Sequence, residues 1–180
     1  MENEKVFIET LLNPKTQQAA FKQLVLQYQK PLYSHIRNIV LNHDDADDVL
    51  QNTFIKVFRN LSKFKGESKL FSWIYRIATN EALTFLQQKT KHYQSSSEEY
   101  LKKQTEKLQA DVYFEGDEIQ FNVQQAIAQV PEKQQLVFKM KYFEEIKYED
   151  LSEILDTSVG ALKASYHHAV KKIEEYLKKD

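Results

Sequence analysis

The most informative stretch of this chain is residues 148–177, which read YEDLSEILDTSVGALKASYHHAVKKIEEYL. Apolar residues recur at steps of three and four on both sides of a polar break at Asp156, Thr157 and Ser158, and such spacing is typical of amphipathic helices. Two short helices, 148–155 and 159–177, joined by a tight polar turn form a helix-turn-helix. The apolar stripe of the second helix is predicted to be Leu162, Tyr166, Ala169, Ile173 and Leu177.

The second predicted helix carries a polar, partly cationic face opposite its apolar stripe. The residues expected to face away from the core are Lys163, Ala164, His167, His168 and Lys171. Side chains on such a face could enter the major groove of DNA. Helical hairpins with a polar turn also occur in proteins that never bind DNA, so the rest of the chain has to discriminate.

The composition of the 180-residue chain restricts its class. Glycine and proline occur only three times each, and the apolar spacing is helical throughout, so we expect an all-α protein. Cysteine is absent, which excludes disulfides and thiolate metal sites. The sequence shows no signal peptide and no stretch of about twenty apolar residues. We therefore expect a cytoplasmic protein that does not insert into a membrane.

Charge is distributed unevenly along the chain. The formal net charge is −1, which argues against a uniformly basic coat for nucleic acid. Residues 55–91, however, contain eight Lys or Arg and two Glu, a net charge of +6. An acidic cluster, Asp44, Asp45, Asp47 and Asp48, lies just before this segment. One surface is therefore expected to bind anions and a neighbouring one cations.

The sequence divides into two helical segments and a connection. Residues 17–88 are predicted to form several helices, with breaks near Pro31, at 43–45 and at 63–68, where Gly66 indicates a loop. Residues from 89 onward are rich in Lys, Glu, Gln and Ser and show little periodicity, so a charged, flexible and at most partly helical linker is expected. Periodicity returns at Ile119, and Pro131 is a natural first-turn residue for a helix through Tyr142. The predicted domains are 1–89 and 119–180, with the linker at 90–118.

Residues 64–85 interleave cations with aromatic rings. On a helix beginning near Ser68, a buried stripe would consist of Leu70, Ile74 and Ile77. Trp73, Arg76 and Asn80 would share an adjacent flank. An aromatic platform with a cation and an amide suits unpaired bases, because stacking contributes roughly 1–3 kcal/mol per base. The alternative that Trp73 simply fills the core stays open.

A helix is also predicted at residues 49–61, preceded by the acidic run, which would favour its N-terminus. The side chains expected to pack inward are Val49, Leu50, Phe54, Val57 and Phe58. Those expected on an outward strip are Asp48, Gln51, Asn52 and Ile55. A strip that mixes amide, carboxylate and apolar groups suits a protein partner.

Enzyme signatures are missing from the sequence. The histidines show no H-E-x-x-H spacing, and neither a phosphate-binding glycine loop nor a G-x-S-x-G motif is present. The acidic run lacks the glycine and terminal glutamate of a calcium loop. We therefore predict no catalytic residues, no metal site and no cofactor.

Several runs of residues resemble a known family. DDVLQNTF at 47–54, FKGES at 64–68 and FSWIYRIATN at 71–80 resemble region 2 of bacterial RNA polymerase sigma factors. VPEKQQ at 130–135 and SVGALKA at 158–164 resemble region 4 of the same factors. Two such regions with only a short linker between them are similar to the extracytoplasmic-function (ECF) subfamily of the sigma-70 family. The resemblance covers about residues 21–91 and 121–178.

The resemblance implies a factor that binds core RNA polymerase and directs promoter recognition, DNA melting and transcription initiation. It implies that the β′ clamp helices are bound by Asp48, Gln51, Asn52 and Ile55. The residues implied to capture and melt the minus-ten element as single strand are Phe64, Lys65, Ser68, Lys69, Trp73, Arg76 and Asn80. Those implied to read the minus-thirty-five duplex, in a region that also contacts the β flap, are Ser158, Lys163, Ala164, His167, His168 and Lys171. By family analogy, an anti-sigma factor is a further partner.

The chain departs from the family pattern in one place. Family members often carry arginine at the positions of Ser165, His168 and Val170, so the recognition helix here is less basic. Its promoter preference is expected to depend more on apolar contact and DNA shape.

Two other functions stay open on the sequence alone. A dimeric helix-turn-helix regulator would bind a palindrome without polymerase, and it would need an exposed apolar dimer seam. An adaptor that sequesters a sigma factor would use the basic aromatic segment only as core.

Overall fold

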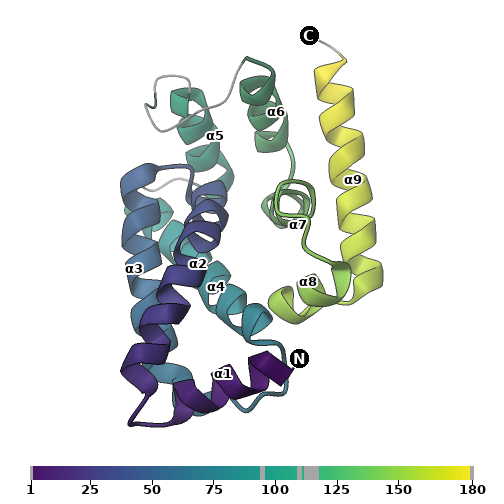
Figure 1. Cartoon of the computed structure of the whole chain (residues 1–180). Coiled ribbons are helices and arrows are strands. Elements are labelled where there is room, and N and C mark those ends of the chain that lie inside the picture. Colours follow the sequence, from purple (N-terminus) through teal and green to yellow (C-terminus); the bar gives the residue numbers. More distant parts are fainter. Residues whose placement is uncertain (1, 94–95, 109–110, 112–117, 179–180) are drawn as a thin grey trace.

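The structure is a computed structural model that describes residues 2–93, 96–108, 111 and 118–178 (Figure 1). Within these residues all regular structure is helical, which confirms the all-α prediction. The N-terminal half contains α1 (Glu2–Leu12), α2 (Gln17–Val40), α3 (His43–Asn60), the single-turn η1 (Leu61–Lys63) and α4 (Leu70–His92). It is followed by α5 (Ser97–Lys107), α6 (Glu118–Ala128), α7 (Glu132–Tyr142), α8 (Tyr148–Leu155) and α9 (Val159–Leu177).

The predicted break near Pro31 is wrong, because α2 runs through this proline without interruption. Proline removes one helical hydrogen bond and usually kinks or breaks a helix. Here Pro31 is exposed to solvent, as is Gln27 one turn earlier. Water can therefore reach the Gln27 carbonyl, which has no N–H of residue 31 to bond. Leu24, about two turns earlier, and Leu32, the next residue, are both fully buried, so the helix packs on the core both before and after the proline.

Helix α3 begins at His43, six residues before the predicted start at Val49, so the acidic run lies inside the helix. The Asn42 side chain caps it by accepting a hydrogen bond from Asp45 N at 3.0 Å, as asparagine commonly does at this position. The buried Asp45 carboxylate lies 2.6 Å from Lys89 Nζ on α4. The acidic run therefore contributes an ion pair between helices as well as a negative first turn.

Helix α4 crosses α2 and α3, and together these helices enclose the main core. Leu24, Ile36, Val57, Ile74 and Ala82 are fully buried there. The N-terminal helix α1, which the sequence patterns had not indicated, packs on α2 and buries Leu11.

The segment predicted as a linker is folded in part. Ser96 caps α5 by accepting a hydrogen bond from Glu99 N at 3.1 Å. Tyr100 and Leu101 are buried in the main core, and α5 packs on α4 and α6. The connection is thus attached to both halves of the protein.

The helix-turn-helix forms where the sequence predicts it. Asp156 ends α8 with a left-handed backbone, φ 49°, and Ser158 caps α9 by accepting a hydrogen bond from Ala161 N at 3.3 Å. Helix α9 buries Leu162, Ala169 and Ile173 of the predicted stripe, whereas Leu177, which was predicted to continue it, is 39% exposed at the end of the helix.

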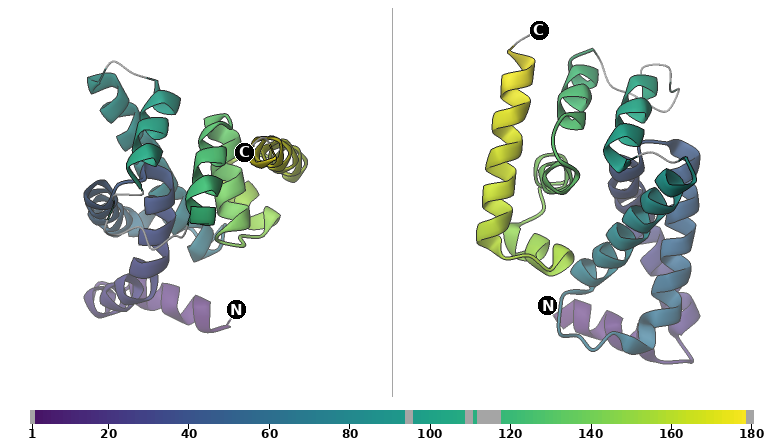
Figure 2. Two further views of the ribbon diagram at one scale, coloured as in Figure 1. Left: turned by 90° about the horizontal axis from the view of Figure 1, so that it is seen from above. Right: turned by 180° about the vertical axis from the view of Figure 1, so that it is seen from behind.

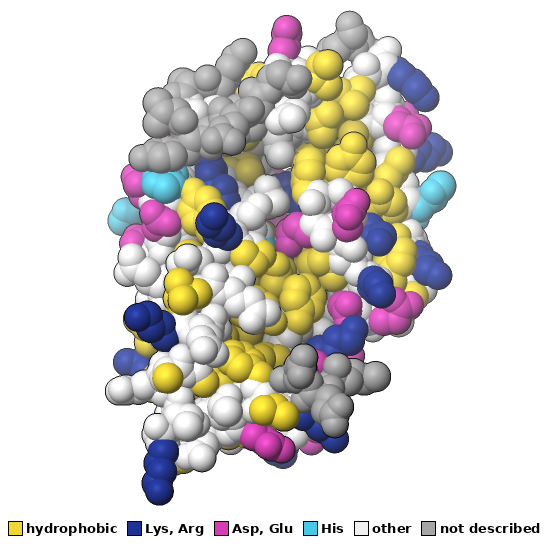
Figure 3. Space-filling model, in the orientation of Figure 1, with side chains coloured by type: hydrophobic (Ala, Val, Ile, Leu, Met, Phe, Trp, Pro, Cys, Tyr) yellow, Lys and Arg dark blue, Asp and Glu magenta, His cyan; other side chains and the backbone are white. Residues whose placement is uncertain are grey.

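The two halves pack against each other. Figure 2 shows the α7–α9 group beside α4 from two directions, and Figure 3 shows hydrophobic side chains between the halves and along the line where α6 meets α9. Leu151, Ile154 and Leu162 belong to the same buried cluster as the α2–α4 residues. A second, smaller cluster lies within the C-terminal half, around Ile127, Val130 and Phe138. Among the described residues, no helix is both long enough and apolar enough to cross a bilayer.

Candidate nucleic-acid interface

The loop between η1 and α4, residues 64–69, is anchored at one end and turned by a glycine. Phe64 is 6% exposed, and its N–H donates to Leu61 O at 3.0 Å. Gly66 adopts φ +71°, a conformation that costs other residues about 1 kcal/mol or more. At the other end, Leu70 N donates to Glu4 Oε1 at 3.2 Å, so α1 helps to fix the start of α4.

Trp73 lies half-buried on the first turn of α4. Its ring centroid is 5.1 Å from that of Phe64, with the planes tilted by 48°. Trp73 packs against the core without belonging to its fully buried set. The indole is therefore supported from below by Phe64 and keeps part of its surface accessible, as a stacking platform requires. Phe64 itself is too deeply buried in this conformation to present its own ring.

The polar side chains predicted beside Trp73 are accessible to solvent to different extents. Lys65, Lys69, Arg76 and Asn80 are exposed, and Ser68 is half-buried. Lys69 Nζ lies 2.5 Å from Asp150 Oδ1 on α8, and this hydrogen bond raises the pKa of Lys69. Arg76 Nε donates to Glu153 O of the same helix at 2.9 Å. Two of the predicted cations, Lys69 and Arg76, thus contact α8.

A second surface lies along α3, where the whole predicted strip is exposed: Asp48, Gln51, Asn52 and Ile55. Ile55 is 48% exposed, and Phe58, three residues later, is 41% exposed. The prediction that Phe58 packs inward is wrong, because its ring is exposed, although one edge of it contacts the half-buried Phe21, with centroids 4.9 Å apart. Its position one helical turn after Ile55 was the signal that could have placed it on the strip.

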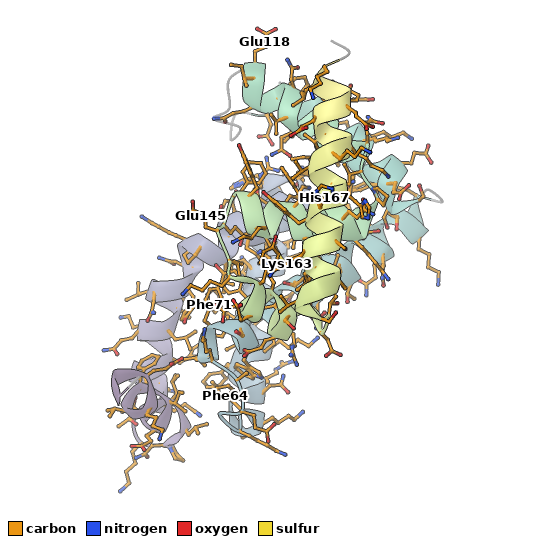
Figure 4. All side chains as sticks on the ribbon, turned by 90° about the vertical axis from the view of Figure 1, so that its right-hand side faces the viewer. Phe64, Phe71, Glu118, Glu145, Lys163 and His167 are labelled. Carbon is orange, nitrogen blue, oxygen red and sulfur yellow. The ribbon has the colours of Figure 1, made fainter. Side chains whose placement is uncertain are left out.

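A third surface is the outer face of α9, which, with the N-cap residue Ser158, includes all the predicted major-groove residues. Those exposed are Ser158, Lys163, Ala164, His167, His168 and Lys171. Figure 4 shows Lys163 and His167 on the same side of this helix. Lys163 Nζ lies 5.6 Å from the centroid of the Tyr148 ring, a cation–π distance. The opposite face is held by Tyr166, which stacks on Phe138 of α7 with centroids 5.7 Å apart.

The described residues contain no group of three or more His, Asp or Glu side chains placed to hold a metal ion. What they do contain is a set of three exposed surfaces: an aromatic and cationic flank on α4, a mixed strip on α3 and a polar face on α9.

Comparison with known proteins places both halves of the chain in one family. Residues 24–92 match the family model for sigma-70 region 2, and residues 120–173 match the model for sigma-70 region 4. These matches do not favour a dimeric regulator that acts without polymerase.

Curated relatives cover nearly the whole chain. The chain is 30% identical to the RNA polymerase sigma-H factor of Pseudomonas aeruginosa over 88% of its own length and 86% of that protein. It is 28% identical to the ECF RNA polymerase sigma factor SigW of Bacillus subtilis, over 91% of this chain and 92% of the relative.

Solved structures share the fold. CnrH, in complex with the cytosolic domain of CnrY, matches with a TM-score of 0.71 at 17% identity and 98% coverage of both chains. The sigma factor RpoE of Bartonella quintana, in complex with the anti-sigma factor NepR, matches with a TM-score of 0.66 at 20% identity, over 89% of this chain and 98% of that one. The chain therefore belongs to the sigma-70 family, in its ECF subfamily of factors that bind core RNA polymerase and direct it to promoters.

Proposed function

We propose that this sigma factor divides initiation among its three exposed surfaces. The α3 strip, extended by Phe58, binds the β′ clamp helices of core polymerase. The α4 flank captures the minus-ten element as single strand, and the α9 face reads the minus-thirty-five duplex while its domain contacts the β flap. The domains that carry these tasks are 1–89 and 119–180.

The observation that carries this proposal is the Trp73 platform. The half-buried indole rests on Phe64, and the exposed Arg76 and Asn80 follow at one-turn and two-turn spacing. An unpaired base can stack on the indole while Arg76 neutralises a phosphate and the Asn80 amide bonds a base edge. Binding of the separated strand would then drive DNA opening, without ATP hydrolysis.

A purified-component transcription assay tests the platform. DNA selected by the reconstituted holoenzyme supplies the promoter. Trp73→Ala should retain core polymerase binding but weaken open-complex formation about fivefold or more, since one stacking contact contributes roughly 1–3 kcal/mol. Trp73→Phe, which keeps an aromatic face, is the matched control and should lose less. Equal loss of polymerase binding and melting would place Trp73 in the core instead.

We further propose that the factor acts in the cytoplasm, where the polymerase works, and that a protein inhibitor regulates it. The complexes of RpoE with NepR and of CnrH with CnrY support the second point. Copurification of the full-length chain with tagged core polymerase, and loss of that association when the inhibitor is co-expressed, would test both partners.

A further inference from the structure

Helix α1 lies across the end of the N-terminal half at which α4 begins (Figures 1 and 2). It packs on α2 and on η1, the turn that leads into the loop 64–69. At the other end of that loop, the Glu4 carboxylate accepts a hydrogen bond from Leu70 N at 3.2 Å. Phe7 packs against the main core and Leu11 is buried in it. Helix α1 is therefore anchored in the core and contacts the elements on both sides of the loop.

Helix α4 begins without a cap from its own sequence. By contrast, α3, α5 and α9 each follow an asparagine or serine whose side chain accepts a hydrogen bond from a backbone N–H of the first turn. The residue before α4 is Lys69, whose ammonium can donate but cannot accept, and which opposes the positive end of the helix dipole. The first N–H groups of α4 therefore need an acceptor from elsewhere in the fold. Glu4 supplies that acceptor together with a negative charge.

The same first turn of α4 carries the Trp73 platform. Trp73 N donates to Lys69 O at 3.1 Å, so the indole stands one turn from the Glu4 contact. Its support, Phe64, lies at the opposite end of the loop, with ring centroids 5.1 Å apart. Helix ends fray when their N–H groups lack partners. Fraying of this turn would move the indole away from Phe64 and disorder the platform.

We propose that Glu4 is a positioning residue for promoter opening. Helix α1 supplies the cap that α4 lacks, and it thereby holds Trp73 on Phe64 in the orientation that accepts an unpaired base. Glu4 does not touch DNA and acts only through the start of α4. Because the platform is ordered before DNA arrives, less ordering accompanies the capture of the strand. Helix α1 precedes the residues that match the region 2 model, which begin at Leu24. The inference rests on the proposed role of Trp73.

Open-complex formation by the reconstituted holoenzyme on its selected promoter is the first readout. Glu4→Ala removes both the acceptor and the charge, and we expect opening to fall about three- to tenfold, as loss of a helix cap would produce. Core polymerase binding should be retained. Glu4→Gln keeps an amide oxygen that can accept from Leu70 N, so it should recover part of the loss. The matched control is Glu9→Ala, the same change at an exposed position of α1, and it should alter opening by less than about twofold.

The fluorescence of Trp73 is the second readout, and it reports the platform without DNA. Trp73 is the only tryptophan of the chain, so the signal is specific. Glu4→Ala should shift the emission to longer wavelength and increase quenching by acrylamide, because a frayed turn exposes more of the indole to water. Glu9→Ala should leave both as in the wild type. All spectra are taken where urea unfolding shows the chain to be folded, so a loss of stability alone does not change them.

Two results would overturn the inference. One is wild-type emission and opening in Glu4→Ala with only a lower urea midpoint, which would make Glu4 an ordinary stabilising contact. The other is an equal loss of opening in Glu4→Ala and Glu9→Ala, which would be a general charge effect. Failure of the proposed function is distinct, because Trp73→Ala would then leave opening unchanged and remove the platform together with the inference. If Trp73→Ala weakens opening and Glu4→Ala does not, the platform stands and only the role of α1 is refuted.

Discussion

Lys139→Met is expected to make the protein more stable at neutral pH and to change how its stability depends on pH. Lys139 is 4% exposed, and burial lowers its pKa from 10.5 to about 8. Below pH 8 the side chain is protonated in both the folded and the unfolded chain, so the full cost of burying the charge is present. As the pH rises from 8 to 10.5 the folded protein releases its proton first, and the cost disappears.

The magnitude follows from the two pKa values. A difference of about 2.5 between them corresponds to about 3 kcal/mol of lost unfolding free energy at pH 7, at about 1.4 kcal/mol per pKa unit. Methionine fills a similar volume but loses the hydrogen bond to Asn38 O, which offsets about 1 kcal/mol. We therefore expect Lys139→Met to gain about 2 kcal/mol at pH 7 and to lose most of that advantage by pH 9.5.

Urea unfolding at both pH values measures this effect, with the wild type and the variant compared at each pH so that other titrating groups cancel. Lys133→Met, at an exposed position on the same helix, is the control and should show no such pH dependence. Linkage requires the gain in unfolding free energy of Lys139→Met to fall by about 2 kcal/mol between pH 7 and pH 9.5. If it changes by less than about 0.5 kcal/mol, Lys139 is not a buried ammonium in the folded protein.

Three further predictions concern the exposed surfaces and the loop. Ile55→Asp should weaken core polymerase binding about tenfold or more while leaving the unfolding free energy within about 0.5 kcal/mol, because Ile55 is 48% exposed; unchanged pull-down of the polymerase would remove the α3 strip from the interface. Gly66→Ala should lower the unfolding free energy by about 1 kcal/mol through backbone strain alone, since φ is +71° and no neighbouring atom lies within 4 Å of the added Cβ. An unfolding free energy in urea equal to that of the wild type would contradict this strain. Lys163→Ala should reduce the salt dependence of holoenzyme binding to duplex promoter by about one in log–log slope, and a slope equal to that of the wild type would mean that Lys163 makes no phosphate contact.

Local signals in the sequence were sufficient for several elements of the fold. The polar turn at Asp156–Ser158 and the apolar spacing on both sides of it placed α8 and α9 correctly, because capping and helical periodicity act over a few residues. The exposure of Gln51, Asn52 and Ile55 was likewise predictable from helical phase alone. The predictions for Pro31 and Phe58 failed, because the course of α2 and the exposure of one ring depend on which side of each helix the core covers.

By itself, the sequence determined that this protein is helical, that it ends in a helix-turn-helix and, Phe58 excepted, which of the predicted residues lie on the outer face of α3 and of α9. The tertiary structure alone decided that Lys69 and Arg76 face α8 and that Glu144 reaches the buried His35, 109 positions earlier in the chain. It also decided that Lys139 lies buried against α2. The physical reason is the separation along the chain between the interacting residues. Helical phase and capping are set by neighbours a few residues apart, whereas contacts between the halves depend on how two preformed helical surfaces fit together.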